Sequence, residues 1–231
     1  MIRSLCKKFK CFVMIKKYDA CSSEVYHLDP VDVMKLSDHP LYEKENKEVV
    51  IFLGNEKEKI PDKLFSGRDL VKQALQEKTP YIPVRFVFLK RAKGIKGFVL
   101  HFIKPFRRKL IAKGMGLYHI RAQELQEKGL VRKIRTRQNA YDLKNKKWAI
   151  PPEERQKRWN DLYASLQKTG YDDHYPLEVM LCRSLGAKDS LQQGHHRMGI
   201  LNELHIERVA VEFSAAGAAP LFIRSFFQSK K

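Results

Sequence analysis

The stretch Gln193-Gly194-His195-His196-Arg197 places one glycine before two histidines and an arginine. A segment rich in aliphatic residues lies on each side of it, at residues 176–182 and at residues 206–213. Both segments have the composition that favours strands, and residues 198–204 between them suit a helix. The predicted order is therefore strand, hairpin-like turn, glycine-containing loop, helix and strand.

Gly194 lets the chain turn sharply where a side chain would collide with its neighbours. The N–H groups at the start of the following helix would then face outward and form an anion site. His195, His196 and Arg197 add further hydrogen-bond donors at the same point. This composition is typical of a phosphate pocket, although a glycine before a helix is common and two histidines can also serve only to cap or to pack.

A second helix is predicted upstream of this stretch. Residues 151–154 read Pro-Pro-Glu-Glu, and prolines with acidic residues are typical of a first helical turn. Apolar residues then recur at helical spacing, at Trp159, Leu162, Tyr163 and Leu166. Gly170 follows as the stop signal. The helix therefore offers one apolar stripe to a small sheet.

Residues of about 148–213 resemble the ParB/sulfiredoxin-like superfamily. The resemblance rests on a helix that ends at residues 162–170, on Pro-Leu-Glu-Val at residues 176–179 and on the glycine turn at residues 193–197. It implies a compact α/β (α+β) domain that holds the phosphates of a nucleotide at this turn. The implied nucleotide-binding residues are Gln193, Gly194, His195, His196 and Arg197.

Two branches of the superfamily fit the residues poorly. Sulfiredoxin-like members carry a cysteine in the turn where this chain has His195, so a sulfur nucleophile is missing for the repair of sulfinic acids. Chromosome-partition members carry an arginine where this chain has His196, and a helix-turn-helix region follows their nucleotide domain. Only 18 residues follow Phe213, so this sequence leaves no room for such a region.

The free serine kinase branch is the most similar one, with Asp-Gly-His-Thr-Arg at the turn. This resemblance implies Glu153 or Glu154 as the general base, with His196 as a further candidate catalytic residue. It also implies ATP or ADP as the nucleotide, and Mg²⁺ if the protein transfers phosphate. However, Gln193 replaces the aspartate, and an amide cannot serve as a base or hold Mg²⁺ as a carboxylate does. A non-catalytic binding protein therefore remains the alternative to a phosphotransferase.

Composition bounds the remaining choices. The chain has 231 residues, of which 43% are hydrophobic, and this content is ordinary for a globular core. We expect its four cysteines, Cys6, Cys11, Cys21 and Cys182, to be reduced thiols of a cytoplasmic protein, because no Cys-x-x-Cys pair or histidine pattern suits a metal. The apolar run near the N-terminus is too short for a signal peptide, and no segment approaches the roughly 20 apolar residues of a membrane span.

The N-terminal part is predicted to form an α/β segment over residues 24–84. Residues 25–28 and 49–53 suit strands, residues 68–76 suit a short helix, and no internal repeat stands out. We place a loose boundary near residue 140, which separates residues 1–139 from the nucleotide-binding domain at residues 140–231. The two parts can also share one core.

Residues 85–137 form a basic stretch, the name kept for them below. They hold 16 Lys and Arg residues against two acids, Glu124 and Glu127, whereas residues 140–213 hold 11 of each sign. Such a local charge attracts polyanions, which predicts contact with nucleic acid, acidic glycan or an acidic membrane surface. Residues 98–114 interleave aromatic residues with cations, which suits a core strand followed by a basic helix, stacking on nucleic acid, or peripheral attachment to a membrane.

Overall fold

A computed structural model describes residues 20–43, 47–89, 111–131, 151–182 and 188–216. These residues form a mixed α/β fold around one nine-stranded sheet. The strands are β1 (Ala20–Leu28), β2 (Asp38–Glu43), β3 (Val49–Phe52), β4 (Lys63–Ser66), β5 (Ile82–Leu89), β6 (Ile111–Arg121), β7 (Leu177–Leu181), β8 (Ser190–Gln193) and β9 (Arg208–Ala216). The helices are α2 (Pro30–Met34), α3 (Arg68–Gln76), α6 (Ala122–Glu127), α8 (Pro152–Thr169) and α9 (His195–Glu203), with a 3-10 turn η1 (Glu56–Glu58).

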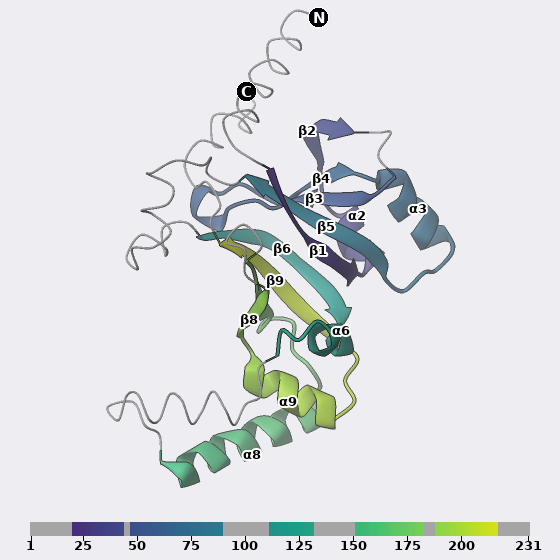
Figure 1. The fold of residues 1–231 in the computed structure, drawn as a ribbon. Coiled ribbons are helices and arrows are strands. Elements are labelled where there is room, and N and C mark those ends of the chain that lie inside the picture. The colour runs from purple at the N-terminus through teal and green to yellow at the C-terminus, as the bar shows by residue number, and fades with distance from the viewer. Residues whose placement is uncertain (1–19, 44–46, 90–110, 132–150, 183–187, 217–231) are drawn as a thin grey trace, which may run out of the picture.

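The strand order is β2-β4-β3-β5-β1-β6-β9-β7-β8. We call residues 20–89 the first half and residues 111–216 the second half. From the centre outward, the first half places β1, β5, β3 and β4, and the second half places β6, β9, β7 and β8 (Figure 1). In each half the first two of these strands are antiparallel, the next pair is parallel and the last pair is antiparallel.

The register of the strands repeats along with their order. Val49 of β3 lies opposite Val84 of β5, and Leu177 of β7 lies opposite Val211 of β9. The pairs β3–β4 and β7–β8 also shift register at the same place, after the first described pair. The order, the directions and the register of the strands are therefore alike in the two halves, although no internal repeat stands out in the sequence.

The two halves meet at a seam between β1 and β6. Within the described residues, the ladder between these strands consists of the antiparallel pair Leu28 and Ile120. Phe86 of β5 and Phe213 of β9 nevertheless lie with their ring centroids 4.3 Å apart, although β1 and β6 separate their strands in the sheet. The sheet therefore bends at the seam, and the inner faces of the two halves share one aromatic core.

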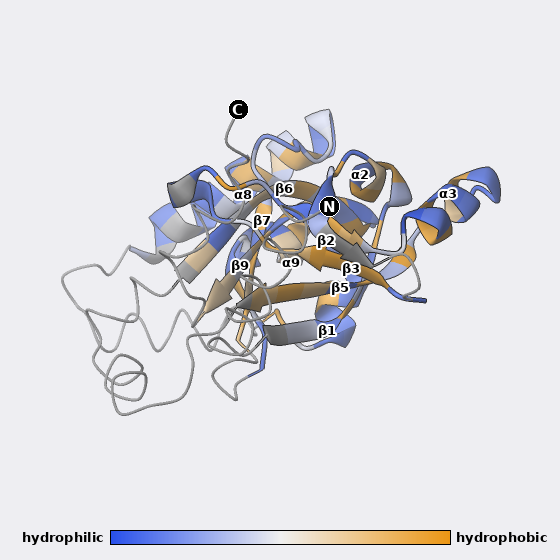
Figure 2. Ribbon diagram, turned by 90° about the horizontal axis from the view of Figure 1, so that it is seen from above, coloured by the Kyte–Doolittle hydropathy of each residue, from blue (hydrophilic) through white to orange (hydrophobic). Residues whose placement is uncertain are grey.

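The helices divide between the halves. Helices α2 and α3 lie beside the first half, α6 and α9 lie beside the second, and α8 lies outside α9 (Figure 1). Hydrophobic residues gather on β3, β5 and β9, whereas α3 shows many hydrophilic residues (Figure 2). The predicted stripe of α8 is confirmed, since Leu166 is buried and Trp159, Leu162 and Tyr163 pack against the core. No helix within the described residues is long and apolar enough to cross a membrane.

Several predicted elements are confirmed, among them the helix at residues 68–76 and the strands near residues 49–53, 176–182 and 206–213. Strand β6 was not predicted, and it lies inside the basic stretch. It pairs with β9 over most of its length. One sheet therefore contains strands from both sides of the predicted boundary near residue 140, and these strands share one core.

Candidate functional site

The predicted turn is present and leads directly into α9. Gly194 has φ 96° and ψ 13°, which is the left-handed conformation, and α9 begins at His195. The Met198 N–H bonds to the Gly194 carbonyl at 2.8 Å, as expected for the first intrahelical bond. Within the described residues, no side chain caps this helix and its first turn contains no acidic residue. The positive end of the α9 dipole therefore lacks a compensating negative charge in its own first turn.

Glycine is favoured at position 194 for two reasons. A left-handed φ is costly for other residues, and a Cβ atom added here would lie 2.2 Å from Cδ2 of Leu177. The chain thus passes close to β7 before it enters α9. Gln193, the last residue of β8, is exposed and lies opposite Glu178 of β7.

The two histidines of the turn have different surroundings. His195 is buried, with 8% of its surface exposed, so it belongs to the interior rather than to the surface of the turn. His196 is exposed, and its ring lies edge-on to Trp159 of α8 with 6.2 Å between ring centroids. Of the two, His196 is the one placed to meet a ligand from solvent.

Arg197 is engaged by the backbone. Its guanidinium donates hydrogen bonds to the carbonyl of Tyr175 and, at 3.2 Å, to the carbonyl of Pro176. These carbonyls belong to residues 171–176, which we call the β7 loop because they lead into that strand. In the empty protein, Arg197 therefore ties the β7 loop to α9.

Two further contacts hold the β7 loop against β9 and β6. The Tyr171 hydroxyl lies 3.0 Å from the carbonyl of Ala210, and burial raises the pKa of Tyr171 to about 12 against the opposing charge of Arg197. Asp173 lies 2.9 Å from Nε2 of His119 on β6. The loop is thus anchored to β9, to β6 and to α9.

His119 connects this loop to the first half of the chain. Its Nδ1 lies 2.7 Å from Asp32 of α2, and its Nε2 faces Asp173. Burial disfavours the charged form of Asp32, but hydrogen bonds from Lys35 and His119 outweigh that cost and lower the pKa of this carboxyl below its usual value. A buried carboxylate of the first half therefore helps to position a loop beside the predicted site.

The predicted catalytic glutamates lie on the neighbouring helix. Glu153 and Glu154 are exposed in the first turn of α8, and Glu154 forms an ion pair with Arg158 at 2.5 Å. The contact between Trp159 and His196 brings α8 against α9, so the glutamates and the turn belong to the same layer of the molecule. Within the described residues, no cluster of three or more His, Cys, Asp or Glu side chains could hold a metal ion.

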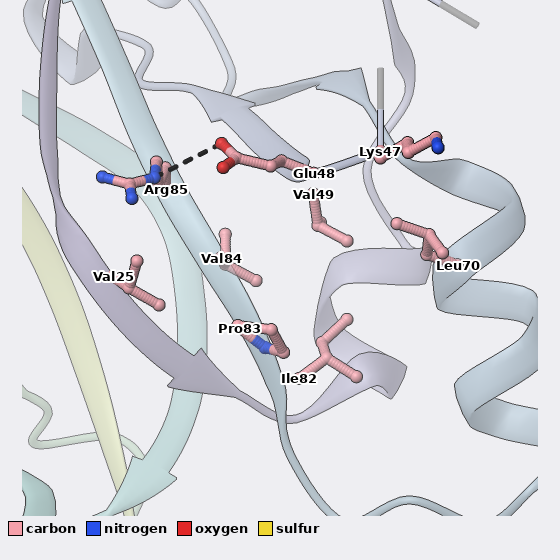
Figure 3. Close-up of a pocket in the computed structure, with 9 residues that line it drawn as sticks. All are labelled: Val25, Lys47, Glu48, Val49, Leu70, Ile82, Pro83, Val84 and Arg85. Carbon is pink, nitrogen blue, oxygen red and sulfur yellow. Dashed lines mark ion pairs between the residues drawn. The ribbon is translucent and has the colours of Figure 1, made fainter. Parts of the chain in front are cut away.

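A pocket of about 360 Å³ lies in the first half, between α3 and the strands β1, β3 and β5 (Figure 3). Its walls are mainly apolar, and Glu48 and Arg85 form an ion pair of 3.3 Å at its edge. The lining residues are Val25, Lys47, Glu48, Val49, Leu70, Ile82, Pro83, Val84 and Arg85. None of the residues predicted for phosphate binding lines it.

The structure describes four cations of the basic stretch. Arg121 is exposed. The other three form ion pairs within the protein, Arg85 with Glu48 at 3.3 Å, Lys113 with Glu212 at 2.7 Å and Lys128 with Glu124 at 3.7 Å. The remaining twelve, and the aromatic residues at positions 98–106, lie outside the described residues. Cys182, which sequence analysis expected to be reduced, is a free cysteine.

Sequence reasoning missed the residues that support the turn. Tyr171, Asp173 and His119 are distant from Gly194 in the sequence, and their types alone do not point to this role. A weak signal existed in Asp172, because Asp is a common turn residue whose side chain accepts from the backbone two residues on, as Asp172 does from the His174 N–H at 2.9 Å. Comparisons with protein-family models, curated proteins and solved structures found no match. The resemblance of residues 148–213 therefore remains a prediction.

Proposed function

We propose that this chain binds a phosphate-bearing ligand, in the first instance a nucleotide such as ATP or ADP, at the turn of residues 193–197. The observation that carries the proposal is the start of α9. A glycine in the left-handed conformation precedes a helix of nine residues, and the first turn of this helix contains neither a side-chain cap nor an acidic residue. Backbone N–H groups and a helix dipole then favour an anion at this point.

We assign unequal roles to the predicted residues. The backbone of His196 and Arg197 and the exposed ring of His196 supply the donors, while Arg197 keeps the β7 loop beside them. His195 supports the turn from the interior. The proposed contacts to phosphate therefore depend more on the backbone and on His196 than on the guanidinium of Arg197.

Phosphate transfer is the finer form of the proposal. Glu153 or Glu154 would act as the general base, and bound Mg²⁺ would neutralise charge on the transferred phosphate. Both carboxylates are exposed on the helix that packs against α9, which supports their candidacy. Release of free or transferred phosphate by the wild type distinguishes an enzyme from a protein that only binds.

Polyanion binding through the basic stretch is the second candidate function. It is supported by the 16 cations against two acids in residues 85–137. Because three of the described cations already have acidic partners, this function rests on Arg121 and on the twelve cations outside the described residues. Binding to single-stranded nucleic acid and to acidic vesicles, compared over a range of salt, tests it directly.

The phosphate site is tested by His196→Asp. An acid in the first turn of α9 favours the helix by about 0.3 to 1 kcal/mol, which offsets the lost contact between the His196 ring and Trp159, so the empty variant should have a stability close to that of the wild type. The same charge repels phosphate, so stabilisation by millimolar ATP, ADP, CTP or GTP with Mg²⁺ should disappear. Thermal unfolding with and without each nucleotide measures both effects.

His196→Asn is the matched control, because it has the shape of the aspartate without its charge. It should keep part of the nucleotide-induced shift in melting temperature. The proposal fails if no nucleotide and no inorganic phosphate shifts the melting temperature of the wild type, or if the aspartate variant responds as strongly as the asparagine variant.

A further inference from the structure

Two tyrosines at the seam reach into opposite halves of the chain. The Tyr26 hydroxyl on β1 donates to Asp189 of the second half at 2.7 Å. The Tyr118 hydroxyl on β6 donates to Asp62 of the first half, also at 2.7 Å. The two aspartates occupy equivalent places, since each lies one residue before a strand that is followed directly by a left-handed glycine. Each half therefore donates a tyrosine hydrogen bond to the equivalent aspartate of the other half.

The histidines that follow these tyrosines also form reciprocal contacts between the halves. The backbone N–H and the ring Nδ1 of His119 lie 2.9 and 2.7 Å from Asp32 of α2. The backbone N–H and the ring Nδ1 of His27 lie 3.1 and 3.3 Å from Glu124 of α6. Each carboxylate is the third residue of its helix. Donors of each half again meet acceptors of the other half.

Several matching positions carry the same or a similar residue type, although Arg85 matches Glu212, which has the opposite charge. The matching segments are Tyr26-His27-Leu28 with Tyr118-His119-Ile120, Val84-Arg85-Phe86 with Val211-Glu212-Phe213, and Asp62 to Gly67 with Asp189 to Gly194, which share the pattern Asp-x-Leu-x-x-Gly. The helices also end alike, because Lys78 after α3 and His205 after α9 both have left-handed φ, at 55° and 52°. In both helices the next backbone N–H returns to a carbonyl five residues earlier, at 2.8 and 2.9 Å.

The aromatic core has the same symmetry. Phe86 and Phe213 contact each other, and each also meets the tyrosine of the opposite half. The ring centroids are 5.0 Å apart for Tyr26 and Phe213 and 5.5 Å apart for Phe86 and Tyr118. In a symmetric dimer, residue i of one subunit contacts residue j of the other and the reverse contact also occurs. The seam follows this rule within a single chain.

We infer that this protein is an internal duplication of one β-α-β-β-α-β unit, folded as the intramolecular counterpart of a two-fold dimer. Two unrelated domains that happened to pack together would share neither strand register nor reciprocal contacts. Each half acts as the partner that holds the turn of the other half in place, because the exchanged aspartates begin the strands that lead to Gly67 and Gly194. This inference does not depend on phosphate binding.

Hydrogen exchange of the full chain tests the inference with the matched variants Tyr26→Phe and Tyr118→Phe. Each variant keeps the ring and removes one hydroxyl. Tyr26→Phe should speed exchange in residues 188–198 by about tenfold or more, the factor that corresponds to a lost hydrogen bond to a charged acceptor. Tyr118→Phe should do the same in residues 60–72. Each variant should leave the other of these two segments near its wild-type rate.

A pattern in which each variant loosens only the turn of its own half would overturn the inference. A second measurement covers the case of a variant that does not fold. A protease site placed within residues 90–110 of the full chain allows cleavage between the halves after folding. The cleaved protein should elute at the size of the intact chain and separate only in denaturant, whereas separation in native buffer contradicts a dimer-like interface.

Discussion

The Gly67 turn of the first half and the Gly194 turn of the second half have the same backbone conformation but carry different side chains. Both glycines are left-handed, at φ 86° and 96°, and both precede a helix of nine residues. The second helical residue is Asp69 in the first half and His196 in the second. An acid at this position compensates the helix dipole, whereas His196 leaves it available to an external anion. The same geometry therefore does not make the same site.

The arginines beside the two turns show a related difference. Arg68 of α3 lies 2.7 Å from Asp38 and 2.5 Å from the carbonyl of Leu36, so it fixes the start of β2. Arg197 of α9 fixes the β7 loop. Strand β2 covers the outer edge of β4, whereas in the second half β8 is the last strand of the described sheet. The two halves thus have the same arrangement of strands around the turn, but the segment that the arginine holds differs between them.

The largest expected effect tests whether the halves share one core. Phe86→Ala and Phe213→Ala should each lower the free energy of unfolding by about 3 to 5 kcal/mol, as for other buried phenylalanines. The two losses should be similar, because each ring packs against the other ring and against one tyrosine of the opposite half. Urea unfolding measures them. A double variant that loses the full sum would show that the two rings act independently.

Acid should weaken the first half through His39 of β2. Burial, with a smaller contribution from the charge of Lys63, lowers the pKa of His39 from 6.5 to about 4. The folded state therefore disfavours the charged ring, so stability is complete above pH 6.5 and falls as the pH drops from 6.5 toward 4. A shift of this size corresponds to about 3 kcal/mol.

His39→Phe is the test, because the ring lies between Phe52 and Phe65 at 5.0 and 5.3 Å. The variant should lose less stability than the wild type when urea unfolding at pH 7 is compared with unfolding near pH 4.5. An unchanged dependence on pH would mean that another group causes it. Because β2 has no counterpart in the described second half, this buried histidine is a feature of the first half.

The smallest expected effects compare the glycines themselves. At Gly67 an added Cβ would lie 2.7 Å from the carbonyl of Glu48 and 2.7 Å from Cα of Val49, and neither backbone atom can move easily. At Gly194 the nearest atom is the end of the Leu177 side chain, which can adjust. We expect Gly67→Ala to cost about 2 to 3 kcal/mol and Gly194→Ala about 1 to 2 kcal/mol. Equal costs in thermal or urea unfolding would show that conformational strain alone decides both positions.

Local patterns predicted much of the fold. The helix that stops at Gly170 carries both apolar periodicity and a termination signal, so its type was clear, and the short helix at residues 68–76 was also predicted. Strand β6 lacks such signals because Gly114 and Gly116 normally weaken a strand. The structure gives their reason, since an added Cβ at Gly114 would lie 2.9 Å from the Asp62 carboxylate, and at Gly116 it would meet the Tyr118 ring.

The repeat and the surroundings of the site depend on contacts that a local pattern does not encode. The shared positions of the two halves are sparse and are separated by different insertions, β2 in the first half and α8 in the second. The position of Gly194 was predictable from its neighbours. The role of Arg197 was not, because its partners are backbone carbonyls 21 and 22 residues earlier in the chain.

The short ladder between β1 and β6 also has an evolutionary consequence. Among the described residues, the ladder between the halves consists of the pair Leu28 and Ile120. Further contacts between the halves extend along β6, from the Asp29 N–H, which donates to the carbonyl of His119, to the Met115 N–H, which donates to Asp62. Additions away from these contacts, such as β2 at one border of the sheet and α8 over the other half, leave the attachment unchanged. Each half can therefore gain or lose peripheral elements while the reciprocal contacts between the halves are kept.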